Sequence, residues 1–229
     1  MIEDIVINSY KEQIKQSILK AEAVKVAGFD LIIGELNKRS IKTDKVMTFF
    51  NKIRNSSTKE EIDNLTVDEL NEIIDDINLQ ITKALISSVE VAELLVRKSR
   101  IIAKEKSPNG KINDNDNYVK VGTNLASEVN KHGIAHGLNI CIKNYCIQKL
   151  YQATYREKIR EKEKELGILV SDEKNKTSSP VIVNTKKSKT MIELFGKNIN
   201  EDIDTFEVVK KNYIDKLNNE VNNIENYRW

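Results

Sequence analysis

The scarcity of proline and glycine is the feature that most limits how this chain can fold. Only two Pro and eight Gly occur in 229 residues. Folds built from strands need many tight turns, and tight turns draw heavily on both residues. Proline also ends helices, and glycine weakens them. A chain with so few of either favours long, uninterrupted helices, so we expect an all-α fold.

Apolar residues recur three or four positions apart along much of the sequence, which is the spacing of one helical face. This pattern predicts helices over 3–38 and 44–54. Thr58 and Thr66 are each followed three positions later by Glu. Such a pair forms a capping box, in which the two side chains bond to free amide groups at the start of a helix. We therefore expect two further helices to begin at these threonines.

Two of the expected helices are very long. The first keeps its apolar stripe from about 66 to 106, and the second covers about 123–166. At a rise of 1.5 Å per residue, each would measure about 60 Å. Helices of compact domains average about 11–12 residues, so the pattern predicts an elongated helical bundle. The stripes are narrow, which is typical of helices that pack against other chains.

The C-terminal part is expected to be an extended arm followed by one more helix. We divide the chain into a helical bundle (1–167), an arm or linker (168–200) and a C-terminal helix (201–229). Within the arm, 171–190 is rich in Ser, Thr, Lys and Asn, a composition typical of linkers. The apolar stripe of the final helix consists of Phe206, Val209, Tyr213, Leu217, Val221 and Ile224.

The charges nearly cancel in total but are unevenly distributed. The net charge is +2, yet residues 11–54 carry +5 and residues 56–96 carry −8. Residues 97–106 carry +4, and residues 191–229 carry −3. Blocks of opposite sign can dock on one another, within one chain or between chains, and so select a partner and a register. The simpler interpretation is that helices often carry faces of one sign.

Several classes of protein are excluded by the composition. The sequence has no apolar stretch of about 18 residues, as a transmembrane helix requires, and its first residues lack the basic start and apolar core of a signal peptide. We therefore expect no membrane partner and a cytoplasmic location. A pI of about 8.3 with balanced charge argues against a dedicated nucleic-acid-binding protein. No phosphate-binding glycine loop or dinucleotide motif occurs, so no cofactor is expected.

The histidines and cysteines all fall on one expected helix, at His132, His136, Cys141 and Cys146. The two histidines are one turn apart, as in a helical zinc-binding His pair. On a continuous helix Cys141 lies about 180° around from His132, and Cys146 lies about 15 Å beyond His136. Zinc–ligand bonds measure about 2.0–2.3 Å, so the four cannot share one ion. We therefore expect no metal site that combines the histidines and the cysteines. His132 and His136 are the only candidates for metal ligands, and the cysteines are expected to be buried thiols.

The segment from Asn130 to Gly137 resembles the Arg-Asn-x-x-Gly-x-x-His-Gly signature of HEPN-type RNases found among abortive-infection proteins. In that family the Arg and the His cleave RNA by acid–base chemistry, usually across a helical dimer. The resemblance places Asn130 and His136 at catalytic positions and implies an RNase, the only enzyme that the sequence suggests. Val129 occupies the position of the family's Arg, so no cation at this position stabilises the transition state.

Long helices, opposed charge blocks and an extended arm together predict a non-enzymatic assembly protein. The pattern resembles neck or connector ring proteins of tailed phages, which are helical subunits with extended arms stacked between portal and tail. The resemblance implies a homo-oligomer in a virion, bound to other proteins of the assembly, with basic faces that contact DNA non-specifically. Two alternatives stay open: an HEPN-like defence or regulatory protein that acts on RNA, and an accessory nucleic-acid-binding protein.

Overall fold

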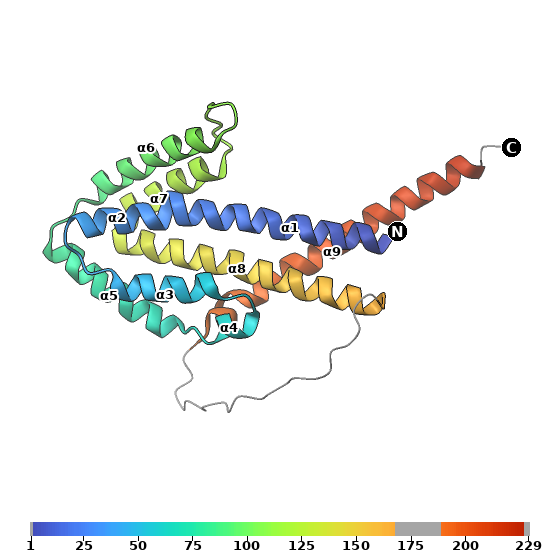
Figure 1. The fold of residues 1–229 in the computed structure, drawn as a ribbon, viewed down its shortest axis with the longest axis horizontal. Coiled ribbons are helices and arrows are strands. Elements are labelled where there is room, and N and C mark those ends of the chain that lie inside the picture. The colour runs from blue at the N-terminus through green and yellow to red at the C-terminus, as the bar shows by residue number, and fades with distance from the viewer. Residues whose placement is uncertain (1, 168–188, 227–229) are drawn as a thin grey trace.

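A computed structural model describes residues 2–167 and 189–226 of the chain. In these ranges every regular element is a helix, apart from one isolated antiparallel bridge between Thr66 and Thr190 (Figure 1). The predicted all-α class is therefore confirmed. The elements are α1 (Ile2–Val24), the π-helical segment η1 (Lys25–Phe29), α2 (Asp30–Lys38), α3 (Asp44–Asn55), α4 (Lys59–Asp63), α5 (Val67–Lys83), α6 (Ser88–Lys106), α7 (Asn117–His132), α8 (Ile134–Glu165) and α9 (Met191–Asn226).

The helix predicted over 66–106 is two helices, α5 and α6, so this prediction is wrong. α5 ends where the Ile86 N–H donates a hydrogen bond to the Ile81 carbonyl oxygen at 3.3 Å. This Schellman arrangement needs one residue in the left-handed conformation, and that residue is usually glycine. Here the residue is Leu85, with a φ of 53°. Because leucine is a good helix former, the sequence carries no stop signal at this point.

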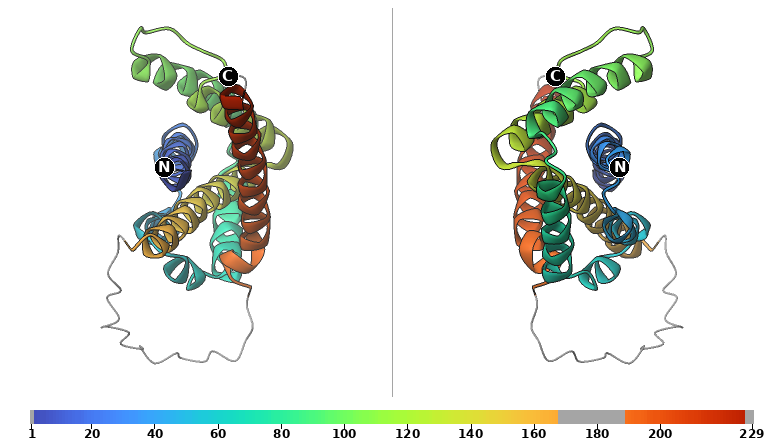
Figure 2. Two further views of the ribbon diagram at one scale, coloured as in Figure 1. Left: turned by 90° about the vertical axis from the view of Figure 1, so that its right-hand side faces the viewer. Right: turned by 90° about the vertical axis from the view of Figure 1, so that its left-hand side faces the viewer.

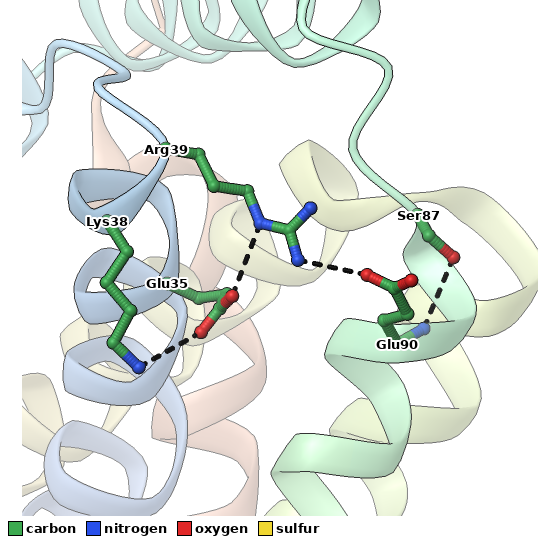
Figure 3. Close-up of polar contacts among 5 residues, drawn as sticks. All are labelled: Glu35, Lys38, Arg39, Ser87 and Glu90. Atoms are coloured by element: carbon green, nitrogen blue, oxygen red, sulfur yellow. Dashed lines mark hydrogen bonds and ion pairs between the residues drawn. The ribbon is translucent and has the colours of Figure 1, made fainter.

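The start of α6 is held by polar contacts with the end of α2 (Figure 3). The Ser87 hydroxyl caps α6 by accepting a hydrogen bond from the Glu90 N–H. The Glu90 carboxylate in turn accepts a hydrogen bond of 2.9 Å from the Arg39 guanidinium, which also donates to Glu35 at 3.3 Å. Arg39 belongs to the basic block of the sequence and Glu90 to the acidic block. Here, then, blocks of opposite sign meet within one chain.

The helix predicted over 123–166 is also two helices, α7 and α8, and this prediction is wrong for a different reason. The chain turns at Gly133, whose φ of 94° and ψ of 166° lie in a region open almost only to glycine. α7 starts at Asn117, earlier than predicted, because the Asp116 carboxylate accepts a hydrogen bond from the Tyr118 N–H. Nothing in the sequence distinguishes Gly133 from a glycine that is tolerated inside a helix.

The shorter predicted elements are confirmed. The run predicted over 3–38 is helical throughout, with the π-helical segment η1 between α1 and α2, and α3 matches the second predicted helix. Both halves of the capping box are present at Thr58. At Thr66 a helix also begins, but with one half of the predicted box: the Thr66 hydroxyl accepts from the Glu69 N–H at 3.2 Å, whereas the Glu69 carboxylate accepts a hydrogen bond of 2.8 Å from Lys52 instead.

The final helix begins ten residues earlier than predicted, at Met191 instead of 201. Thr190 and Glu193 form a capping box, because each side chain accepts a hydrogen bond of 3.2 Å from the backbone N–H of the other residue. The same Thr-x-x-Glu pattern as at Thr58 was therefore available in the sequence. The predicted arm over 171–190 lies outside the described residues, apart from its last two positions.

The described helices share one hydrophobic core, with α8 at its centre (Figures 1 and 2). α1 packs along α8, and α6 and α7 form a hairpin beside η1. Phe29 of η1 stacks on Phe50 of α3 with ring centroids 3.8 Å apart, and Phe50 meets Tyr145 of α8 at 4.5 Å. The apolar stripes of this body are thus largely covered within the chain, contrary to the expectation that they would pack mainly on other chains.

Replacing Leu85 with glycine should stabilise the protein. The Leu85 side chain is 87% exposed, so its removal forfeits little burial, while glycine relieves the cost of the left-handed conformation. We expect Leu85→Gly to raise the free energy of unfolding by about 0.5–1 kcal/mol, measured by urea denaturation. Leu85→Ala keeps the Cβ atom and should bring no gain. A Leu85→Gly protein that unfolds at a lower urea concentration than the parent would contradict this assignment.

Replacing Gly133 with alanine should have the opposite effect. The backbone at Gly133 is open almost only to glycine, so we expect Gly133→Ala to cost about 1–3 kcal/mol in the free energy of unfolding. Gly34→Ala is the matched control, because Gly34 lies inside α2 with nothing within 4 Å of an added Cβ. That control should gain up to about 1 kcal/mol. Equal effects of the two substitutions would refute the turn at Gly133.

Candidate functional site

His132 and His136 lie at the corner between α7 and α8. His132 is the last residue of α7, and His136 belongs to the first turn of α8, on the other side of Gly133. The expectation that both histidines share one continuous helix is therefore wrong. Their imidazole rings are nevertheless adjacent, with centroids 4.9 Å apart.

Glu128 completes a cluster with the two histidines. It precedes His132 by one turn of α7, and its Oε2 atom lies 3.4 Å from Nε2 of His136. One ligand atom from each of the three side chains lies within 4.8 Å of the other two. Imidazole and carboxylate groups are ligands of transition metals such as zinc. We call Glu128, His132 and His136 the corner cluster; our sequence analysis missed Glu128.

Two glycines fix the geometry of this corner. The Gly133 N–H donates to the Val129 carbonyl oxygen at 2.9 Å, and the Gly137 N–H donates to the Gly133 carbonyl oxygen at 3.1 Å. A Cβ atom on Gly137 would lie 2.3 Å from Cγ2 of Val129, so a larger residue would push the two helices apart. The backbone that carries the corner cluster is thus held by hydrogen bonds and close packing.

A pocket of about 470 Å³ adjoins the corner cluster, between α1, α7 and α8. Glu128 lines this pocket together with Lys20 and Lys120, while Leu125 and Cys141 contribute apolar surface. Its volume is within the range of small-molecule pockets, about 300–1,000 Å³. Glu128 therefore belongs both to the corner cluster and to a space of the size of a small ligand.

The two cysteines are buried thiols, as predicted. Cys141 is 2% exposed and Cys146 is fully buried. Burial raises the pKa of Cys146 to about 12 and raises that of Cys141 well above its ordinary value. Both side chains are therefore neutral at physiological pH, and neither offers the thiolate that acts as nucleophile or metal ligand.

The residues of the RNase resemblance lie on two helices. Asn130 is exposed on α7, whereas His136 belongs to the corner cluster on α8. Val129, at the position of the family's Arg, is fully buried. RNA cleavage by Asn130 and His136 stays a prediction.

The basic run over 97–106 lies on α6, where its Lys and Arg side chains are exposed. One of them, Arg100, forms an ion pair of 3.2 Å with Asp114 in the loop that follows. Contacts between such a surface and the phosphates of DNA would not distinguish one base sequence from another. Contact with DNA through this surface stays a prediction.

The first half of α9 rests on a group of tyrosines from α1 and α8. Ring centroids of Tyr10 and Tyr151 lie 5.6 and 6.4 Å from that of Tyr155. The Tyr10 hydroxyl donates a hydrogen bond to Glu207, and the Tyr151 hydroxyl donates one to Asp202, both at 2.7 Å. Burial and these hydrogen bonds raise the pKa of Tyr10 and Tyr151, which keeps both as donors. We call the three tyrosines the tyrosine seat.

Comparisons with protein-family models, with curated proteins and with solved structures found no match for this chain. None of the helices within the described ranges combines the length and the apolar content that crossing a bilayer requires. Three features of the described residues bear on function, namely the corner cluster, its pocket and α9.

Both cysteines should be unreactive in the folded protein. A buried, neutral thiol is a poor nucleophile, so we expect a chromogenic disulfide reagent at about pH 8 to label the native chain only as fast as it unfolds. In denaturant the same reagent should label both thiols at once. Rapid labelling of one thiol per native chain would show that the pocket exposes Cys141, and would contradict the burial described above.

Proposed function

We propose that this protein is a non-enzymatic assembly protein and that the distal part of α9 contacts other subunits. The observation that carries the proposal is the course of α9. The helix has 36 residues, about 54 Å in length, and its last turns run beyond the end of the helical bundle (Figure 1). Helices gain most of their stability from packing of an apolar face and little from their own hydrogen bonds. A partner surface is the natural source of that packing for a helix that leaves its own bundle.

The first part of α9 is bound to the helical bundle. The part up to Glu207 is tied to the bundle, because Ile203 is buried and the tyrosine seat donates to Asp202 and Glu207. The next residue, Val208, is 59% exposed. From Val209 to Ile224 the sequence keeps apolar residues three or four positions apart. This spacing is typical of a helix that packs against another helix.

The partner that we propose is a second copy of the chain. Most soluble oligomers are built from identical subunits, and α9 of another copy would offer a stripe with the same spacing. As the setting we propose a connector ring of a phage particle, the class that the sequence pattern resembles. Other virion proteins and DNA in the channel are then further partners.

Solution mass tests the proposal directly. We expect light scattering after size-exclusion chromatography at micromolar concentration to give a multiple of the 26.2 kDa chain mass. Leu217→Asp places a charge in the α9 stripe and should shift the protein toward the monomer mass. A parent protein that stays monomeric throughout this concentration range would refute assembly through α9.

Asn219→Asp is the matched control, because it introduces the same charge about 200° around the helix from Leu217. This variant should keep the mass of the parent protein. Circular dichroism should show equal helix content in both variants, which separates loss of assembly from loss of folding. Equal dissociation by the two substitutions would point to a general charge effect and count against the stripe as the contact.

A further inference from the structure

The corner cluster lies away from the assembly contact proposed for α9. The proposed assembly function therefore makes no use of the side chains of the corner cluster. Its three side chains come from α7 and α8, on both sides of Gly133. Two imidazoles and one carboxylate are a ligand set with which proteins hold zinc while leaving a fourth coordination position open. We propose that Glu128, His132 and His136 bind a divalent transition-metal ion, and that Zn²⁺ is the ion that suits them best.

The distances within the corner cluster suit a single ion. Zinc bonds to nitrogen and oxygen measure about 2.0–2.2 Å, so neighbouring ligands of a tetrahedral ion lie about 3.4 Å apart. Nε2 of His136 and Oε2 of Glu128 are already 3.4 Å apart. All three ligand atoms lie within 4.8 Å of one another. The ligand atom of His132 therefore needs to approach by at most about 1.5 Å, which a small side-chain rotation can supply.

The backbone places the three side chains of the corner cluster close together before any ion binds. Glu128 and His132 are one turn apart and share a face of α7, and His136 reaches the same place from the first turn of α8. Close packing at Gly137 and the hydrogen bonds at Gly133 hold the two helices together. Little conformational entropy is then lost on binding, because only side chains have to be ordered.

Solvent can reach the site. The side chains of His136 and Glu128 are 43% and 37% exposed, so a bound ion would keep a water molecule in its fourth position. Two nitrogen ligands disfavour Mg²⁺ and Ca²⁺, which prefer oxygen. They favour the later first-row ions, including Zn²⁺.

A simple ion pair between Glu128 and protonated His136 is the competing explanation. It accounts for the 3.4 Å contact but gives no role to His132, whose ring lies against that of His136. Metal binding accounts for all three residues.

Calorimetry on the full chain, without a histidine tag and treated with a chelator beforehand, tests the proposal. We expect one Zn²⁺ per chain and a rise in melting temperature with zinc concentration, because the ion binds the folded state. Mg²⁺ at the same concentration should produce neither effect. Co²⁺ should give a spectrum without a thiolate charge-transfer band, because the buried cysteines take no part.

Four surface variants make the test specific. His132→Ala, His136→Ala and Glu128→Gln should each weaken zinc binding by at least about 10-fold. Lys131→Ala, at an exposed position between the ligands, should bind zinc like the parent. Equal melting temperatures of all four in the absence of zinc would exclude misfolding as the cause.

Three results would overturn the proposal. The first is the absence of zinc binding by the parent chain in calorimetry and melting. The second is undiminished binding by any of the three ligand variants. The third is a thiolate band in the Co²⁺ spectrum, which would assign the metal to the cysteines instead.

Discussion

The burial of α8 on every side at residues 152–155 is the constraint on which the rest of this fold depends. Four consecutive residues, Gln152 to Tyr155, are all buried, and at about 100° per residue they point all around the helix axis. A helix buried in this way needs neighbours on every side, and α1, α3, α4, α5, α7 and α9 all contact it. Burial of a large apolar side chain contributes about 1.5–3 kcal/mol, more than a typical surface ion pair, so packing around α8 decides the arrangement.

Helix content could be predicted from this sequence, and so could the helix starts that carry a polar cap. Thr58 and its glutamate form the box that the sequence indicates, and the same pattern at Thr190 marks the true start of α9. The breaks at Leu85 and Gly133 could not be predicted, because the sequence around each of them is also compatible with a continuous helix. Leucine usually continues a helix, and only the left-handed backbone at Leu85 shows that α5 ends here.

The corner cluster could be predicted only in part. His132 and His136 are four positions apart, which places them close together on any helix. Glu128 and His136 are eight apart, and on a straight helix about 12 Å would separate them. Their contact at 3.4 Å exists because the chain turns at Gly133. The residue that ends α7 thus also assembles the cluster, and no periodicity in the sequence reveals it.

The π-helical segment η1 has a consequence for how related chains should be compared. Its hydrogen bonds span five residues instead of four, so it accommodates one residue more than a regular turn. The apolar positions before and after it are therefore out of phase by about 100°, while Val24, Ala27 and Phe29 all stay buried. Deleting one residue here would restore a regular helix and rotate all of α2 relative to α1. In an alignment of homologues, a gap at this point should therefore coincide with a shifted hydrophobic pattern throughout α2.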